Sequence, residues 1–213
     1  MKCDKRWMTL YAVTDRAWLG ERTLHEQVEQ ALRGGATCVQ LREKHLDKAD
    51  VLREAVALKA LCGSYGVPLI INDDVEIMLQ SGADGVHIGQ DDGDVAQIRR
   101  RIGPGKLLGV SAHTVEEAVR AERDGADYLG AGAVFATGTK PEAGNLAYET
   151  LKAICKAVSI PVAAIGGISA ANVTHLAGAG IDGIAVVSAI FAAEDIEHAT
   201  AALKALTVEA LGL

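Results

Sequence analysis

Short apolar segments alternate with longer segments of helical character along the whole sequence. The longer segments carry apolar residues at helical spacing or strong helix formers, most clearly at 23–35, 47–66, 114–125 and 194–211. The short segments are rich in β-branched residues, which favours buried strands. They span residues 9–13, 37–41, 68–72, 84–88, 107–111, 127–131, 161–165 and 182–187. The pattern therefore predicts eight strands that alternate with helices.

Residues typical of helix ends separate these segments. Asp47 and Thr114 stand where N-caps are expected, and Gly34, Gly66 and Gly125 stand just beyond the last helical turns. A similar phrase joins a helix to the next strand four times: GGATCVQL (34–41), GADGVHI (82–88), GADYLGA (125–131) and GIDGIAV (180–186). This repetition indicates that one helix-to-strand unit is used several times.

Eight alternations of strand and helix within 213 residues predict a TIM (β/α)₈ barrel that forms a single domain over residues 1–213. The alternative is an open, doubly wound sheet that binds a dinucleotide. The segment GAGIDG (178–183) matches the G-x-G-x-x-G pattern, but it precedes a strand and no helix opens on it. The segment therefore lacks the strand before it and the helix after it that a dinucleotide-binding motif requires.

Charge and cysteine content exclude several classes of protein. A net charge of −7 argues against nucleic-acid binding, which requires a basic face. No apolar segment approaches the length of a membrane span, and no apolar signal region precedes the first strand. The four cysteines are scattered without a CxxC pair, as expected for small buried side chains in a reducing compartment. We therefore expect a cytoplasmic protein with no nucleic-acid or membrane partner; a homo-oligomer is possible.

Polar side chains gather where the predicted strands end. In a barrel of this type the chemistry lies at the carboxyl ends of the strands and in the loops that follow. Gln40, Arg42 and Lys44 share one parity, so an extended chain would direct all three to the same side. The other polar residues at these ends are Thr14, Asp15, Arg16, Asn72, Asp73, Asp74, His87, Gln90, Asp91, Asp92, Ser111 and His113. We expect the active site at this rim.

Two of these acids, Asp73 and Asp92, follow adjacent predicted strands. Mg²⁺ takes one or two carboxylates and completes its shell with water and phosphate oxygens, so the pair could bind this ion. The alternatives are ion pairs with Arg42 or Lys44, or simple solvation. The neighbouring Asp74 and Asp91 are expected to cap the helices that follow.

Cations and glycines at the same rim predict two sites for phosphate groups. Arg42, Lys44 and Lys140 could together bind a diphosphate beside the acid pair. Gly166–Gly167 and Val187–Ser188 follow the seventh and eighth strands, where barrels of this type commonly bind phosphate. The alternative for the glycines is a tight turn that needs their dihedral freedom. Zinc-protease, Walker A and nucleophile-elbow motifs are absent from the sequence.

Several segments together resemble the thiamine-phosphate synthase family. They are YAVTDR, QLREK, IND, HIGQDD, GVSAHT, FATGTK, AIGGI and VVSAI, in this order and spacing, and the resemblance runs from about Leu10 to about Phe191. One departure is Ala136, which stands where many family members carry proline. The loop 136–145 is a plausible lid in this family.

The resemblance implies a transferase that joins a pyrimidine diphosphate to 4-methyl-5-(2-phosphoethyl)thiazole, giving thiamine phosphate and diphosphate with one Mg²⁺ per subunit. The pyrimidine diphosphate is 4-amino-2-methyl-5-(diphosphooxymethyl)pyrimidine, and C–O bond breaking would precede capture by the thiazole. The implied pyrimidine site comprises Gln40, Leu41, Arg42, Glu43, Lys44, Asn72, Ser111 and Lys140, of which Arg42, Lys44, Ser111 and Lys140 would act in catalysis. The implied thiazole phosphate site comprises Thr137, Gly138, Thr139, Gly167, Val187 and Ser188, and the implied metal ligands are Asp73 and Asp92.

Two other functions fit a barrel with such a rim. A thiazole tautomerase of the same barrel family would transfer a proton and need no diphosphate site; both acids, QLREK and Lys140 argue against it. A non-catalytic barrel that senses thiamine precursors would need the pocket but not the acid pair.

Overall fold

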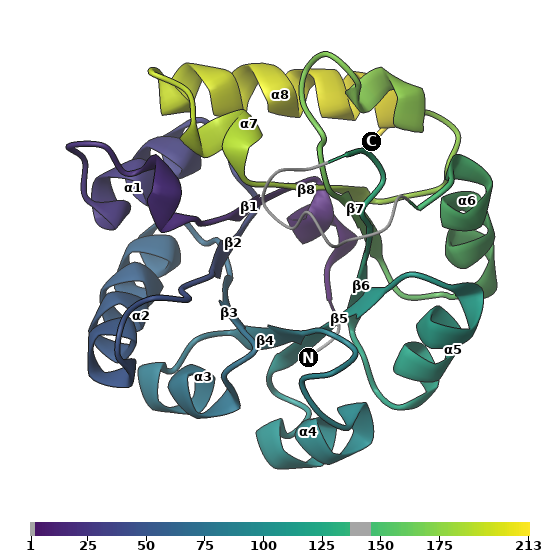
Figure 1. Cartoon of the computed structure of the whole chain (residues 1–213), viewed down its shortest axis with the longest axis horizontal. Coiled ribbons are helices and arrows are strands. Elements are labelled where there is room, and N and C mark those ends of the chain that lie inside the picture. Colours follow the sequence, from purple (N-terminus) through teal and green to yellow (C-terminus); the bar gives the residue numbers. More distant parts are fainter. Residues whose placement is uncertain (1–2, 137–145) are drawn as a thin grey trace.

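The eight strands close into one barrel in a computed structural model that describes residues 3–136 and 146–213. Every strand pairs in parallel with its neighbours in sequence, and β8 pairs with β1 to complete the ring. Figure 1 looks through this ring, with the helices forming an outer layer around it. The predicted (β/α)₈ barrel is confirmed.

All eight predicted strands are present, and each end differs by at most one residue from the sequence pattern. They are β1 (Leu10–Val13), β2 (Cys38–Leu41), β3 (Leu69–Asn72), β4 (Gly85–Ile88), β5 (Leu107–Ala112), β6 (Tyr128–Gly132), β7 (Val162–Ile165) and β8 (Gly183–Val186). Because the strands are only four to six residues long, two or three side chains of each point into the barrel.

An α-helix follows every strand except β7. They are α1 (Leu24–Arg33), α2 (Lys48–Ser64), α3 (Val75–Ser81), α4 (Val95–Ile102), α5 (Val115–Arg123), α6 (Tyr148–Ala157), α7 (Ser188–Phe191) and α8 (Ile196–Leu211). Short 3₁₀ helices are η1 (Lys5–Met8), η2 (Arg16–Trp18) and η3 (Val173–Leu176). Within the described ranges, no helix is long and apolar enough to cross a membrane.

The connection from β7 to β8 differs from the predicted pattern, because it contains only the 3₁₀ helix η3. Gly178 and Gly180 follow it with φ angles of 76° and 86°, which an α-helix cannot accommodate. The predicted caps Asp47, Asp74 and Thr114 each accept a hydrogen bond from the backbone of their helix. Asp91 is not a cap.

The cap of α4 is Asp94, whose carboxylate accepts a 2.7 Å hydrogen bond from the Gln97 N–H. The prediction for Asp91 was wrong because the loop after β4 continues through Gly93, whose φ of 138° is compatible with glycine but not with a helix. Asp91 is exposed in this loop.

Two separate apolar cores stabilise the barrel. The larger core lies between the strands and the helices, and includes Leu41, Ile71 and Leu129 from the outward faces of the strands. The smaller core fills the barrel itself. Its buried members are Met8, Tyr11, Val13, Cys38, Ile70, Leu107, Tyr128, Ala163 and Ala185. The strand alternation therefore separates an outer from an inner set of side chains.

The repeated sequence phrase before the even-numbered strands forms hydrogen bonds at the amino ends of the barrel strands. Each phrase places a side-chain oxygen against the N–H group of the first or second residue of the preceding strand. The carboxylates of Asp84, Asp127 and Asp182 accept these bonds from Leu69, Leu108 and Val162 at 2.9, 2.8 and 3.0 Å, and the Thr37 hydroxyl accepts one from Leu10 at 2.8 Å. The repeat thus joins strands in pairs, by satisfying backbone donors that would otherwise be unpaired.

Candidate active site

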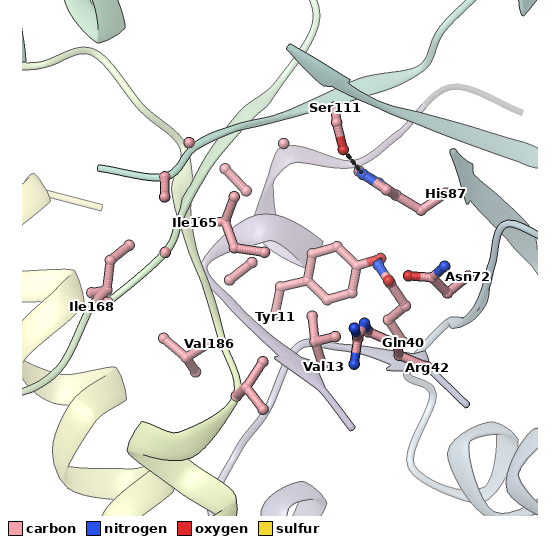
Figure 2. A pocket seen from close by; sticks show the side chains of 18 of the residues that line it. Tyr11, Val13, Gln40, Arg42, Asn72, His87, Ser111, Ile165, Ile168 and Val186 are labelled. Atoms are coloured by element: carbon pink, nitrogen blue, oxygen red, sulfur yellow. Dashed lines mark hydrogen bonds between the residues drawn. The ribbon is translucent and has the colours of Figure 1, made fainter. Parts of the chain in front are cut away.

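A cavity opens at the carboxyl ends of the strands, and its lining comes from all eight of them. Figure 2 shows Tyr11, Gln40, Asn72 and His87 directed into it from β1 to β4. Among the described residues, the lining comprises Tyr11, Val13, Gln40, Arg42, Asn72, His87, Ser111, His113, Gly130, Gly132, Ala133, Ala163, Ile165, Gly166, Gly167, Ile168, Ala185, Val186, Val187 and Ser188. The predicted location of the site at this rim agrees with the cavity.

The two sides of the cavity differ in side-chain size and polarity. Strands β2 to β5 contribute Gln40, Asn72, His87 and Ser111, so this side offers hydrogen-bonding groups. Strands β6 to β8 contribute mainly small residues, and these are Gly130, Gly132, Ala163 and Ala185. A TIM barrel is normally filled by layers of bulky side chains. Here the small residues leave open space in the cavity beside the polar wall.

A chain of hydrogen bonds crosses the barrel beneath the cavity. The Gln40 amide nitrogen donates to the Tyr11 hydroxyl at 2.6 Å, and the Tyr11 and Tyr128 hydroxyl oxygens are 2.9 Å apart. The Tyr128 hydroxyl is 3.2 Å from His87 Nδ1, and His87 Nε2 is 3.0 Å from Ser111 Oγ. Burial raises the pKa of both tyrosines well above 10, so both hydroxyls remain protonated.

The segment after β2 is fixed by ion pairs with neighbouring loops. Arg42 Nη1 lies 3.3 Å from the Asp15 carboxylate, and Lys44 Nζ lies 2.6 Å from that of Asp73. Arg42 and Lys44 lie beyond the end of the strand, which stops at Leu41. The three polar residues from Gln40 to Lys44 therefore do not share one extended face, although Gln40 and Arg42 both line the cavity.

Two residues of this segment turn away from the cavity. Leu41 is 1% exposed and packs in the outer core between strands and helices. The side chain of Glu43 is 2% exposed and pairs with Arg16 at 2.5 Å, while it also accepts the N–H groups of Lys44 and His45. Burial alone would raise the pKa of Glu43, but the Arg16 and backbone hydrogen bonds outweigh it and lower this pKa. Glu43 therefore fixes the loop that presents Arg42 and Lys44.

Asp73 and Asp92 lie after adjacent strands, since β3 and β4 pair with Asn72 opposite His87. Asp73 has a φ of 64° and pairs with Lys44, which is one of the alternatives that the sequence left open. The Asp92 carboxylate accepts a 2.6 Å hydrogen bond from the Gly89 N–H. Over the described ranges, no three His, Cys, Asp or Glu side chains form a metal site by themselves.

The glycine pair after β7 faces the start of α7 across one end of the cavity. Gly166 and Gly167 have φ angles of 101° and 64°, so the tight-turn alternative is correct for their backbone. Both also line the cavity together with Val187 and Ser188. Val187 precedes α7 without a side-chain cap hydrogen bond, which leaves the helix start suited to an anion.

Four of the predicted site residues, Thr137, Gly138, Thr139 and Lys140, lie outside the described residues. Of the others, the structure brings Gln40, Arg42, Asn72, Ser111, Gly167, Val187 and Ser188 together in one cavity. Lys44, Asp73 and Asp92 belong to the loops at the same rim but are not part of the lining.

Sequence reasoning missed Tyr11 and Tyr128 and gave little weight to His87. Strand parity would have found them, because Tyr11 shares its parity with Val13, and Tyr128 shares its parity with Gly130 and Gly132, all on the inward face. No local pattern, however, shows that the two tyrosines meet, since they are 117 residues apart in the chain.

Comparison with known proteins identifies the family. The model of the family described as thiamine monophosphate synthase matches residues 10–190. The chain belongs to the thiamine monophosphate synthase family. Within this family it is 50% identical to a thiamine-phosphate synthase of Ruminiclostridium cellulolyticum, over 94% of this chain and 95% of that one. It is 52% identical to one of Chloroflexus aurantiacus, over 92% and 91% of the two chains.

A solved structure agrees with this family. Thiamine phosphate pyrophosphorylase from Pyrococcus furiosus superposes with a TM-score of 0.90 at 38% identity, covering 98% of this chain and 99% of that one. The resemblance drawn from the sequence motifs is confirmed. The chain is an enzyme of thiamine biosynthesis with thiamine-phosphate synthase activity.

Proposed function

We propose that the enzyme joins 4-amino-2-methyl-5-(diphosphooxymethyl)pyrimidine to 4-methyl-5-(2-phosphoethyl)thiazole, releasing diphosphate and thiamine phosphate. The observation that carries this proposal is that residues expected for both substrates line a single cavity: Gln40, Arg42, Asn72 and Ser111 on one side, and Gly167, Val187 and Ser188 on the other. A bond between two substrates can form only where both bind next to each other.

The polar wall suits the pyrimidine diphosphate. Asn72 and Ser111 offer amide and hydroxyl groups to the aminopyrimidine ring. Arg42 lies at the mouth above them, 17% exposed at its side chain, and its guanidinium can bind phosphate oxygens in place of Asp15. Lys44 and Lys140 would complete the cationic set that receives the diphosphate.

The opposite end suits the phosphate of the thiazole. The backbone N–H groups after β7 and at the start of α7 provide donors for an anion, and the Ser188 hydroxyl adds one more. The small residues of β6 to β8 would accept the thiazole ring between this phosphate and the pyrimidine. Thr137, Gly138 and Thr139 would contribute from the loop after β6.

The residues proposed for Mg²⁺ fit this ion chemically. Asp73 and Asp92 offer carboxylate oxygens from adjacent loops, and substrate phosphate oxygens and water would complete the shell. Asp73 is 30% exposed at its side chain and pairs with the ammonium group of Lys44, whose 45% exposed side chain could turn to the diphosphate. Bound Mg²⁺ would supply charge neutralisation to the departing diphosphate.

We propose a dissociative reaction. The C–O bond of the pyrimidine substrate breaks, diphosphate leaves with the electron pair, and the thiazole nitrogen donates its lone pair to the resulting carbocation. Arg42, Lys44 and Lys140 would stabilise the negative charge that develops on the leaving group. Both barrel tyrosines are buried with raised pKa values, so neither supplies a competing phenolate nucleophile. The apolar side chains of Ile165, Ile168 and Val186 limit the access of water to the carbocation.

A diphosphate-release assay with both substrates tests this function. We expect release only when both substrates and Mg²⁺ are present, and none after treatment with EDTA. A thiazole tautomerase would convert the thiazole alone without releasing diphosphate, and a sensor would bind the precursors without turnover. Release that is unchanged by EDTA would exclude the proposed role of the metal.

Ser188→Ala separates the two proposed substrate sites. The variant should raise the KM for the thiazole phosphate and leave the KM for the pyrimidine diphosphate unchanged, because Ser188 lies at the β8 end of the cavity. An effect confined to the pyrimidine substrate would contradict the assignment.

We also propose a cytoplasmic location, which the four free cysteines support.

A further inference from the structure

The hydrogen-bond chain beneath the cavity has a defined direction. An amide nitrogen can only donate, so the Tyr11 oxygen accepts from Gln40 and its own hydrogen must find another acceptor. Tyr11 is 2% exposed, and a buried hydroxyl without an acceptor is costly. Its neighbours are the Tyr128 oxygen at 2.9 Å and the thiol of Cys38, which is a weak acceptor. Because an oxygen is a stronger acceptor than a thiol, we assign the Tyr11 hydrogen to the Tyr128 oxygen.

The chain of hydrogen bonds continues from Tyr128 to the rim of the barrel. Tyr128 is fully buried, and after accepting from Tyr11 it donates to His87 Nδ1 at 3.2 Å. A neutral imidazole whose Nδ1 accepts must carry its hydrogen on Nε2. Nε2 then donates to Ser111 Oγ at 3.0 Å. The Ser111 hydroxyl hydrogen is consequently directed to a ligand in the cavity.

Two glycines leave space inside the barrel for the rings of His87 and Tyr128. A Cβ atom at Gly109 would lie 2.2 Å from Tyr128 Cζ and 2.5 Å from His87 Nδ1, and one at Gly130 would lie 3.1 Å from His87 Cε1. Both glycines have strand conformations and occupy strand interiors, where glycine is otherwise unfavourable. Only glycine at 109 allows the His87 ring and the Tyr128 hydroxyl to meet.

We propose that Tyr128 is a positioning residue, which fixes His87 in the Nε2–H tautomer so that Ser111 donates its hydrogen to the bound pyrimidine substrate. The part that concerns the substrate rests on the proposed function, whereas the tautomer is a property of the enzyme alone. Tyr128 itself is separated from the cavity and does not belong to its lining.

The tautomer can be measured without substrate in protein labelled with ¹⁵N at histidine. Long-range ¹H–¹⁵N correlation spectra distinguish the Nε2–H from the Nδ1–H form, and His87→Gln identifies the signal among the six histidines. Should that variant fail to fold, single replacements of the other histidines assign it by elimination. We expect the Nε2–H pattern in the wild type and a shift towards the Nδ1–H form in Tyr128→Phe, which removes only the hydroxyl.

A matched control removes a tyrosine hydroxyl elsewhere. Tyr148 on α6 is exposed in the outer layer of helices, where its hydroxyl donates to the Ala177 carbonyl at 2.7 Å, so Tyr148→Phe should leave the His87 signal unchanged. A wild-type Nδ1–H signal, or a Tyr128→Phe spectrum identical to the wild type, would overturn the proposal.

Kinetics then test the consequence for the substrate. Tyr128→Phe should lower kcat/KM for the pyrimidine diphosphate about five- to tenfold, as expected for one misdirected hydrogen bond, and leave the KM for the thiazole phosphate unchanged. An equal effect on both substrates would indicate a general loss of structure and refute the role in orienting Ser111. A wild type without synthase activity would refute the proposed function. The histidine spectra would still test the tautomer, because they need no substrate.

Discussion

The ammonium group of Lys44 lies 2.6 Å from the carboxylate of Asp73, which joins the loop after β2 to the loop after β3. Both side chains are partly exposed, at 45% and 30%, so the pair can exchange partners at little cost. In the proposed reaction Lys44 would bind diphosphate and Asp73 would bind Mg²⁺. In that reaction the pair would keep two oppositely charged groups neutralised by each other until substrate and metal bind.

Replacing a proposed metal ligand should weaken the response to Mg²⁺. We expect Asp92→Asn to raise the half-saturating Mg²⁺ concentration by at least about tenfold, since even indirect partners of metal ligands have effects of this size. Titration of diphosphate release with Mg²⁺ measures it. The matched control is Asp91→Asn, which changes an exposed neighbour in the same loop. Equal curves for both variants would remove Asp92 from the metal site.

The carboxylate of Asp127 should contribute strongly to stability. It accepts the N–H of Leu108, the second residue of β5, and pairs with Arg99, and its side chain is 16% exposed. Asp127→Asn should therefore lower the free energy of unfolding in urea by about 2–3 kcal/mol. The control Asp124→Asn breaks an exposed pair with Arg123 and should leave the unfolding midpoint unchanged. Similar midpoints for both variants would contradict the proposed joining of strands.

Glu43 should make stability depend on pH in the acid range. The native protein lowers the pKa of Glu43 below 4.5, so folding favours the ionised form. The resulting stabilisation is fully present above the unfolded-state pKa and is lost as the pH falls through the lower, folded-state pKa. We expect Glu43→Gln to be less stable than the wild type at pH 7, with the difference shrinking as the pH falls below 4.5. A difference independent of pH, measured by urea unfolding from pH 7 to pH 3, would contradict this.

Gly167→Ala should impair the proposed thiazole phosphate site. A Cβ atom at this position, where φ is 64°, would lie 2.4 Å from the Ala136 carbonyl oxygen and 2.9 Å from Phe135 Cβ. The loop must shift, and the KM for the thiazole phosphate should rise. Gly82→Ala is the control, because Gly82 has a φ of 71° but open space around it. Gly82→Ala should lose about 1–2 kcal/mol of stability without a change in the KM for the thiazole phosphate. Equal KM values for this substrate in the two variants would argue against the proposed site.

The cysteines should react slowly with alkylating reagents in the native protein. Burial raises the pKa of Cys3 and Cys62 to about 12 and that of Cys155 to about 11, and raises the pKa of the fully buried Cys38 well above its usual range. Mass spectrometry after iodoacetamide treatment at pH 8 should show little modification until the protein is denatured. Rapid labelling of the native protein would contradict the raised pKa values of these thiols.

The sequence by itself determined the strands, the approximate limits of four helices and the rim that carries the polar residues. This was possible because strand alternation, helix caps and the repeated helix-to-strand phrase are local properties of the chain. The position of the site followed from the rule that chemistry lies at the carboxyl ends of barrel strands. The motifs also sufficed to identify the family.

Only the tertiary structure decided how individual side chains are used. Leu41 and Glu43 lie within a motif expected to bind substrate, yet one packs under a helix and the other pairs with Arg16 from another loop. Tyr11, His87 and Tyr128 meet inside the barrel only because closure of the ring brings β1, β4 and β6 together and glycines leave the space. Such contacts depend on residues far apart in the chain, and no local pattern encodes them.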